Sequence, residues 1–234
     1  MIDFDLAGIS LQHVSHQLDC NGYASLASVM SPASCNTLAD RYDNGSIQFR
    51  STITMAHHNF GRGEYKYFAY PLPSVVADLR ASIYPALASI ANTWEERLGT
   101  GTVWPTELSK LLDLCHRAGQ TRPTPLMLRY GTNDFNCLHQ DLYGDVHFPL
   151  QVIVQLSPPE QFTGGELVLV EQRPRMQSLP TVITMAQGCG VVIPVRDRPF
   201  KGARGWRRHQ MRHGVSRVTS GQRQTLGLIF HDAV

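Results

Sequence analysis

Short β-rich runs fill the chain after about residue 121, and they constrain its fold more than any other feature. Each run is rich in apolar and β-branched residues and is bounded by Gly, Pro or Asn. Several short strands with turn residues between them favour a sandwich or jelly roll. The predicted strands are Leu126–Tyr130, Gln151–Leu156, Glu166–Glu171, Gly190–Val195 and Thr225–His231.

Two helices are predicted before residue 121, over Pro73–Leu98 and Thr106–Ala118, because apolar residues recur there at helical spacing. Ser74 is the expected N-cap of the first helix, and Gly99 its stop. Pro85 implies a kink or two helices end to end. We therefore predict an α+β fold in a single domain, 1–234. In it, 1–121 supplies supporting helices and a lid, and 122–234 forms the jelly-roll core.

Two glycine-containing segments carry local predictions. Thr163-Gly164-Gly165-Glu166 is expected to be a hairpin turn, because paired glycines supply the positive φ values that a two-residue turn needs. Gly61–Tyr70 resembles a hairpin or a lid. His57 and His58 precede it and have no motif partner.

Composition narrows the class of protein. The net charge is +2 and only three lysines are present, so arginine, which suits planar anions, carries the positive charge. The five cysteines are widely spaced without a C-x-x-C pair, which indicates neither a disulfide framework nor a zinc knuckle. With no basic-then-apolar N-terminus and no membrane-length apolar run, we expect a cytoplasmic protein without a membrane partner. Its oligomeric state is not indicated.

His139-Gln140-Asp141, with His213 much later in the chain, has the composition of a metal site. Two imidazoles and one carboxylate on one face of a metal leave three positions open, as in non-haem Fe(II) oxygenases. Arg223 follows His213 by ten residues and is a cation placed to hold an anionic co-substrate.

Four motifs follow one another along the chain: His139-Gln140-Asp141, Phe162–Leu167, Gly188–Ile193 and His213–Arg223. Together they resemble the Fe(II)/2-oxoglutarate-dependent dioxygenase superfamily, nearest its prolyl-hydroxylase-like branch. Two segments, Asn136–Gly144 and Glu171–Gln177, more narrowly resemble an uncharacterised bacterial family of such oxygenases that is predicted to act on nucleic acid.

This resemblance implies a double-stranded β-helix, or jelly-roll, core with Fe(II) held by His139, Asp141 and His213. It also implies 2-oxoglutarate as co-substrate, which would be converted with dioxygen to succinate and carbon dioxide while the substrate is hydroxylated or oxidatively demethylated. Superfamily members that halogenate lack the carboxylate at the position of Asp141, so hydroxylation is favoured.

The co-substrate contacts are likewise transferred by resemblance. Arg223 would pair with the C5 carboxylate of 2-oxoglutarate in a charge-assisted contact. Thr225 is two residues further along the same predicted strand and faces the same way, so it could add a hydroxyl. Tyr130 is a third candidate from the strand before the iron ligands. Asn136 and Gln151 are further pocket candidates without an assigned role.

A basic segment between Arg196 and Arg217 is the main clue to the substrate. Its cations, opposed only by Asp197, are interleaved with aromatic residues, which suits a single-stranded nucleic acid or a phosphate-bearing substrate. The competing interpretation is a solvated loop with local ion pairs. The candidate substrate contacts are Arg207, Arg208, Trp206 and Tyr67.

Two alternatives stay open. One is hydroxylation of a small molecule, an amino acid or a protein side chain, which nothing in the sequence excludes. The other is a non-catalytic metal-binding jelly roll that acts as a sensor or binding protein. Intact Asp141 and Arg223 argue against the second alternative, because a protein that had lost turnover would not need both.

Overall fold

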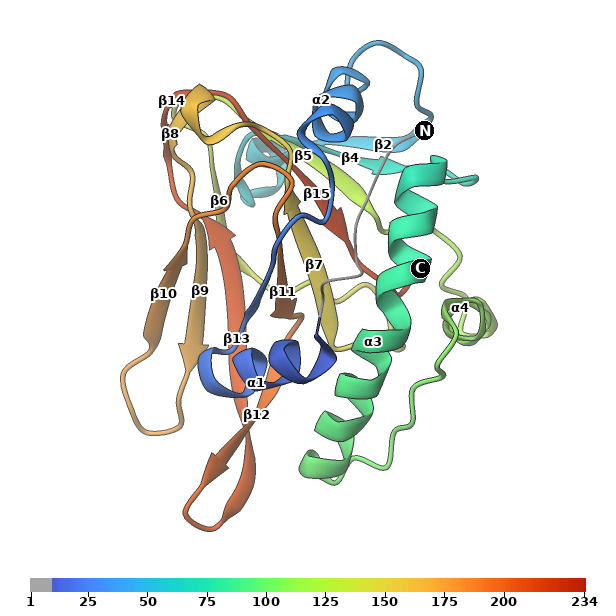
Figure 1. The fold of residues 1–234 in the computed structure, drawn as a ribbon, viewed down its shortest axis with the longest axis vertical. Helices are drawn as coiled ribbons and strands as arrows, with labels where there is room; N and C mark the ends of the chain where they lie inside the picture. Colours follow the sequence, from blue (N-terminus) through green and yellow to red (C-terminus); the bar gives the residue numbers. More distant parts are fainter. Residues whose placement is uncertain (1–9) are drawn as a thin grey trace.

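The computed structural model describes residues 10–234 and has two facing antiparallel sheets with helices outside the larger one (Figure 1). This arrangement confirms the α+β class and the jelly-roll, or double-stranded β-helix, core. The larger sheet has the strand order β1 (Ala24–Leu26), β11 (Gly190–Pro194), β7 (Leu150–Gln155), β15 (Arg223–Leu228), β5 (Leu126–Tyr130), β4 (Glu64–Phe68) and β2 (Phe49–Thr54).

The second sheet faces the larger one and carries a side hairpin. Its order is β10 (Leu179–Ile183), β9 (Leu167–Gln172), β13 (Gly205–Val215), β6 (Phe135–His139) and β3 (Gly61–Arg62), with β12 (Asp197–Gly202) also paired to β13. A separate pair joins β8 (Phe162–Gly164) to β14 (Val218–Gly221). Within residues 10–234, no helix is both long and apolar enough to cross a membrane.

Side-chain alternation along the larger sheet separates its two faces. In β15, Leu226 and Leu228 pack into the main core with the helices, whereas Arg223 and Thr225 line a cavity between the sheets. In a strand, successive side chains point to opposite faces, so one element supplies both core and site. β7 and β5 show the same alternation.

Four α-helices complete the described fold: α1 (Leu11–Asn21), α2 (Pro32–Asp40), α3 (Ser74–Leu98) and α4 (Leu108–Arg117). The long helix α3 is a single element through Pro85, so two helices end to end is wrong. The predicted Ser74 cap is also wrong, because Pro73 is the N-cap and Ser74 is already helical. Gly99 ends the helix as predicted, at φ 63°.

The division at residue 121 does not follow the sheets. β1, β2 and β4 from the first part belong to the larger sheet, and β3 belongs to the second, so the first 121 residues are more than helical support. At the predicted hairpin or lid, Gly61–Tyr70, β4 is one arm of a hairpin: it pairs antiparallel with β2 before it and with β5 on its other side, inside the larger sheet.

The predicted hairpin turn at Gly164-Gly165 is wrong, because the two glycines connect β8 to β9, which belong to different sheets. β8 pairs with β14, while β9 pairs with β10 and β13, so the strands on either side of the glycines do not pair with each other. Both glycines have positive φ as predicted, 71° at Gly164 and 69° at Gly165. A Cβ on Gly164 would lie 2.2 Å from the Arg217 carbonyl oxygen, so close backbone approach also requires glycine there.

Candidate metal centre and its cavity

Strand register brings the two predicted histidine ligands together. His139 ends β6 and lies directly opposite His213 on β13, with the ring centroids 4.2 Å apart. The side chain of His213 is buried and that of His139 is 35% exposed, so the pair spans from the interior towards the cavity mouth. Two residues separated by 74 positions therefore meet through one antiparallel pairing.

Asp141 completes the predicted triad. It is 7% exposed, with Oδ1 3.5 Å from His139 Nε2 and Oδ2 3.2 Å from His213 Nε2. One ligand atom from each of the three residues lies within 4.8 Å of the others, close enough for all three to bind one ion. The Tyr143 hydroxyl donates a hydrogen bond to Asp141 Oδ1 at 2.7 Å.

Protonation in the triad suits a cation. Burial would raise the pKa of Asp141, but the adjacent His139 and His213 hold it well below its usual value. Burial and the neighbouring His139 lower the pKa of His213, which favours its neutral, metal-binding form. His139 Nδ1 lies 2.8 Å from the Cys137 carbonyl oxygen, and we assign the proton to this nitrogen, which leaves Nε2 free to coordinate.

A cavity of about 310 Å³ adjoins the triad between the two sheets. Apolar and aromatic side chains make up much of its wall, and polar groups converge among them, as in small-molecule sites. Phe60, 47% exposed, and Leu138 lie at its mouth. Apart from the triad, the polar lining residues include Tyr65, Tyr67, Tyr130, Asn136, Tyr143, Gln151, Arg223 and Thr225.

Arg223 is the cation of this cavity. It begins β15 opposite Tyr130 of β5, and only 2% of it is exposed. Burial lowers the pKa of its guanidinium to about 10, while Tyr130 and Glu166 act in the opposite direction, so it remains charged at neutral pH. Within residues 10–234 its side chain has no hydrogen bond or ion pair. A buried, unpaired cation is costly, which fits an anionic ligand in the cavity.

The other residues predicted to contact the co-substrate also line this cavity. Thr225 lines the same wall, two residues from Arg223 on the same strand. Tyr130 is fully buried and accepts a hydrogen bond from Asn136 Nδ2 at 3.3 Å. Gln151 also lines the cavity, with its Nε2 3.5 Å from His213 Nε2.

Tyr67 is the only predicted substrate contact that the structure places in this cavity. Its hydroxyl donates to the Tyr143 hydroxyl at 3.1 Å, so it lies one step from Asp141. Sequence reasoning missed Tyr143 and Tyr65. Tyr65 lies two residues before Tyr67 on β4, so same-face spacing was the available signal for it. Tyr143 lies after the end of β6, so its closeness in sequence to Asp141 was the only signal for it.

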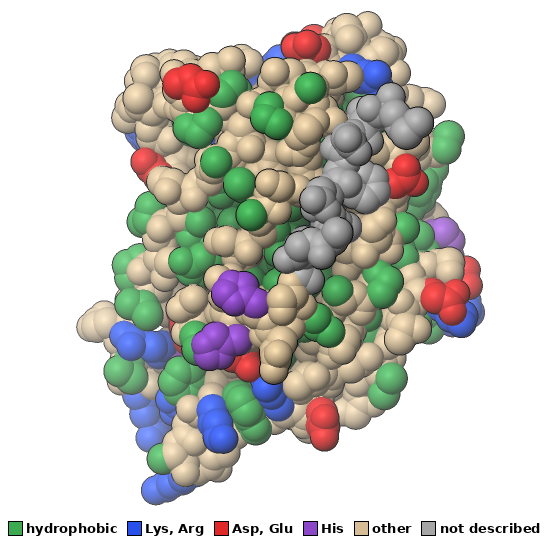
Figure 2. Space-filling model, in the orientation of Figure 1, with side chains coloured by type: hydrophobic (Ala, Val, Ile, Leu, Met, Phe, Trp, Pro, Cys, Tyr) green, Lys and Arg blue, Asp and Glu red, His purple; other side chains and the backbone are tan. Residues whose placement is uncertain are grey.

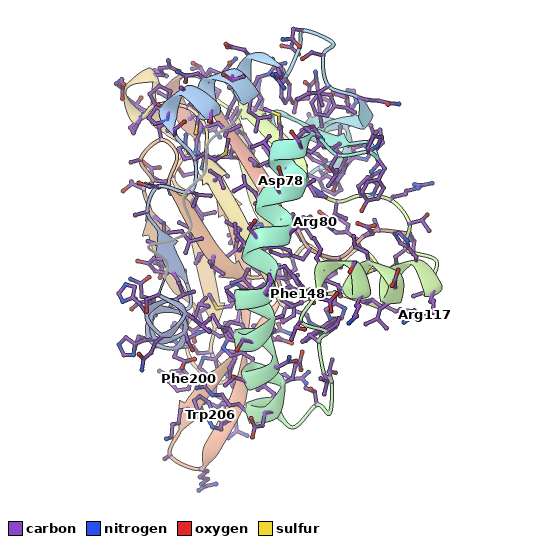
Figure 3. All side chains as sticks on the ribbon, turned by 45° about the vertical axis from the view of Figure 1, so that its right-hand side comes forward. Asp78, Arg80, Arg117, Phe148, Phe200 and Trp206 are labelled. Carbon is purple, nitrogen blue, oxygen red and sulfur yellow. The ribbon has the colours of Figure 1, made fainter. Side chains whose placement is uncertain are left out.

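Arg207, Arg208 and Trp206 do not line the cavity. They lie at the far end of β13, next to Phe200 of β12, and Figure 3 shows Trp206 near the lower end of α3. His57 and His58 lie in a 3₁₀ turn, Met55–His58, and do not line the cavity either.

Several solved structures share this fold. A Pseudomonas putida prolyl-4-hydroxylase has a TM-score of 0.56 and 15% identity, with 96% of this chain and 100% of that chain covered. A Burkholderia pseudomallei oxidoreductase of the 2OG-Fe(II) oxygenase family has a TM-score of 0.55 and 17% identity, with coverages of 99% and 96%. A Trichoplax adhaerens prolyl hydroxylase, in complex with a hypoxia inducible factor peptide fragment, has a TM-score of 0.56 and 18% identity, with coverages of 95% and 89%.

Sequence relatives identify the family. Two Mycobacterium tuberculosis proteins from different strains, both named as uncharacterized, are 53% identical over 167 residues, which is 71% of this chain and 72% of theirs. The Oxygenase-NA family is described as an oxygenase catalysing oxidative methylation of damaged DNA, and its model matches residues 63–233. That span contains the triad and Arg223. The chain therefore belongs to the Oxygenase-NA family.

Proposed function

We propose that this protein is an Fe(II)- and 2-oxoglutarate-dependent oxygenase that hydroxylates, or oxidatively demethylates, a damaged base in nucleic acid. One observation carries the oxygenase part of the proposal. The buried, unpaired Arg223 shares a single cavity with the His139, Asp141 and His213 triad. A cation set back from a metal triad suits a co-substrate with two anionic ends, one for the metal and one for the guanidinium.

The donor set fits Fe(II). Two imidazoles and one carboxylate are its facial ligands in non-haem oxygenases, and they leave positions for a bidentate co-substrate and dioxygen. Fe(II) bound there would supply dioxygen activation coupled to oxidative decarboxylation of 2-oxoglutarate to succinate and carbon dioxide. The hydrogen bond from Tyr143 to Asp141 Oδ1 leaves Oδ2 as the free ligand oxygen.

The cavity residues would bind and orient the co-substrate. Arg223 would hold its distal carboxylate, with Thr225 donating a hydroxyl beside it. Leu128, Ile153 and Val215 line the same space and exclude water from it. Exclusion of water strengthens the charge-assisted contact, because the effective dielectric constant is lower there.

A nucleobase is the substrate that this cavity and family support best. The family description names damaged DNA. Phe60 is exposed at the mouth and stacked on His58, with ring centroids 5.3 Å apart, so its aromatic face lies where a base turned out of its strand would enter. Hydroxylation of an N-methyl carbon on such a base would be followed by loss of formaldehyde, which leaves the demethylated base.

The test is conversion of 2-oxoglutarate to succinate by the Fe(II)-loaded protein, with an N-methylated oligonucleotide as substrate. We expect loss of the methyl group and formation of formaldehyde, with no change in the unmodified oligonucleotide. Asp141→Ala should abolish succinate formation, whereas Asp145→Ala, an exposed carboxylate four residues away, should not. Full turnover in Asp141→Ala would refute the oxygenase. Succinate formation that no methylated oligonucleotide stimulates would refute the substrate class.

A further inference from the structure

The hairpin formed by β12 and the first half of β13 projects beyond the facing sheets (Figure 1). We call residues 197–210 the basic hairpin. Its turn passes through Gly205 at φ 110°, and nearly all of residues 201–208 are exposed. The segment that sequence analysis read either as a nucleic-acid contact or as a solvated loop is thus an ordered two-stranded ribbon outside the catalytic cavity.

Unpaired positive charge gathers on this ribbon. Figure 2 shows Lys and Arg side chains concentrated over it at the lower left. Its one acid is Asp197, whose side chain is 18% exposed and already lies 3.6 Å from Arg196 and 3.9 Å from Arg208. Within residues 10–234, the exposed cations of the ribbon and its continuation that have no ion pair are Lys201, Arg204, Arg207 and Arg212. Like charges this close repel one another, so an anionic partner would stabilise them.

Aromatic rings lie among these cations. Trp206 is 37% exposed, with the Arg97 guanidinium 4.4 Å from its ring centroid and Lys201 Nζ 5.8 Å away. The Arg207 guanidinium lies 5.0 Å from the Phe200 centroid. Cation–π contacts orient the charges without neutralising them. An alternation of cations and rings suits a phosphate backbone with bases beside it better than it suits an acidic peptide.

Buried contacts fix the ribbon to the body of the protein. Arg198 is 3% exposed, and its Nη2 lies 2.9 Å from Glu171 Oε2 on β9 while its Nη1 donates to the Asp19 carbonyl oxygen at 3.0 Å. His209 is buried against the same carboxylate and stacks on Phe200 at 4.3 Å. The charged surface is therefore held at a set distance from the metal site.

That distance follows from the shared strand. Arg207 and His213 both lie on β13, six residues apart. An extended strand rises about 3.3 Å per residue, so they are separated by about 20 Å. Arg212, one residue before His213 on this strand, is exposed and points to the opposite face of the strand.

We propose that the basic hairpin is a second nucleic-acid contact, which binds the phosphate backbone about 20 Å from the base that enters the cavity. This inference rests on the proposed function for its substrate class. It moves Arg207, Arg208 and Trp206 from the reacting site to a distal surface. The surface contributes affinity independent of base identity, whereas the cavity selects the damaged base.

The experiment measures binding of a fluorescent single-stranded DNA of about 24 nucleotides by anisotropy at several salt concentrations. The variant Lys201→Gln/Arg204→Gln/Arg207→Gln removes three unpaired charges. We expect its affinity to fall at least about tenfold at about 50 mM salt. The slope of log K against log salt should become shallower by about 2, because each lost phosphate contact contributes about 0.7.

A matched variant controls for net charge. Lys110→Gln/Arg117→Gln/Arg122→Gln removes the same charge from exposed positions in α4 and just after it, and Figure 3 shows Arg117 well away from Trp206. It should keep the affinity and salt slope of the wild type. Trp206 is the one exposed tryptophan among residues 10–234, so DNA should quench wild-type fluorescence and leave Trp206→Phe unquenched. An equal loss of affinity in the two triple variants would overturn the proposal.

Turnover of 2-oxoglutarate by the same wild-type preparation separates this proposal from the one on which it rests. If the wild type forms succinate but the hairpin variant binds DNA as the wild type does, the hairpin proposal fails and the oxygenase stands. If the hairpin variant alone loses DNA affinity while the wild type forms no succinate, the nucleic-acid surface stands and the oxygenase fails.

Discussion

Asp141 is the most constrained side chain of the site at the scale of single residues. Its Oδ1 accepts a hydrogen bond from Tyr143 at 2.7 Å, and Tyr143 in turn accepts one from Tyr67 at 3.1 Å. Its Oδ2 is 3.2 Å from His213 Nε2. Hydrogen bonds to a ligating carboxylate orient it and tune the metal, so Tyr143 is a positioning residue for the triad.

We predict that Tyr143→Phe weakens binding of Co(II), used in place of Fe(II), by about tenfold or more, because loss of the hydroxyl releases Asp141 Oδ1. Calorimetric titration measures this affinity independently of turnover. Tyr84→Phe is the control, since it removes a hydrogen bond to the Pro105 carbonyl oxygen in the core, away from the cavity. Equal metal affinity in both variants would show that Tyr143 is only structural.

At the scale of elements, the position of Arg223 at the start of β15 depends on the Gly164-Gly165 segment, which packs beside it. A Cβ on Gly165 would lie 2.8 Å from Val218 Cγ2 and 3.1 Å from Arg223 Cδ. The second glycine of the pair therefore leaves room for the side chain that would hold the co-substrate. β15 and the Gly164-Gly165 segment therefore form one unit, in which the absence of a side chain at Gly165 sets the position of Arg223.

Gly165→Ala is accordingly predicted to raise the KM for 2-oxoglutarate more than it lowers kcat, because the methyl group displaces Arg223. Because Gly165 has a left-handed φ of 69°, an alanine there should also lower the free energy of unfolding by about 1 kcal/mol. Gly45→Ala isolates this second effect, since Gly45 has φ 72° and nothing within 4 Å of the added Cβ. Steady-state kinetics and urea unfolding separate the two effects. A KM for Gly165→Ala no higher than that for Gly45→Ala contradicts the prediction.

For the whole molecule, hydrophobic periodicity in the sequence predicted the individual strands and helices, because these depend on the spacing of neighbouring residues. All five predicted strands and both predicted helices exist, with ends shifted by up to three residues. Period-two alternation correctly placed Arg223 and Thr225 on one face, and the residues predicted as metal ligands, His139, Asp141 and His213, lie together in a group that could hold a metal ion.

Pairing between distant segments accounts for what was missed. β1 pairs with β11 and β4 with β5, and such partners depend on packing of the whole chain, which local periodicity does not encode. The basic segment was predicted to contact the substrate because its cations are interleaved with aromatic residues, a pattern that does not encode its distance from the triad. Extended strand geometry instead carries Arg207 about 20 Å away.

Buried His231 gives the molecule a predicted acid sensitivity. It is fully buried, and its Nδ1 accepts a hydrogen bond from the Phe148 backbone N–H at 3.2 Å. Burial lowers its pKa from 6.5 to about 3, so the unfolded chain binds a proton there that the folded protein does not. This contribution lowers the free energy of unfolding as pH falls from about 6.5 to about 3, by about 1.4 kcal/mol per pH unit.

His231→Asn retains a hydrogen-bond acceptor but does not titrate. Its free energy of unfolding, measured by urea denaturation at a series of pH values, should fall less steeply below pH 6.5 than that of the wild type. Parallel curves for the two proteins would contradict the assignment.

The most direct measurement for the central claim is the affinity of the metal-loaded protein for 2-oxoglutarate in Arg223→Gln, by anaerobic calorimetry. Loss of a charge-assisted contact predicts about 10- to 100-fold weaker binding. Metal affinity and thermal stability should be retained, because within residues 10–234 the buried guanidinium has no hydrogen bond or ion pair and only a contact with the Tyr130 ring. Arg217 lies six residues before Arg223 and is exposed, so the control variant Arg217→Gln should bind the co-substrate as the wild type does. Unchanged 2-oxoglutarate affinity in Arg223→Gln would contradict the account.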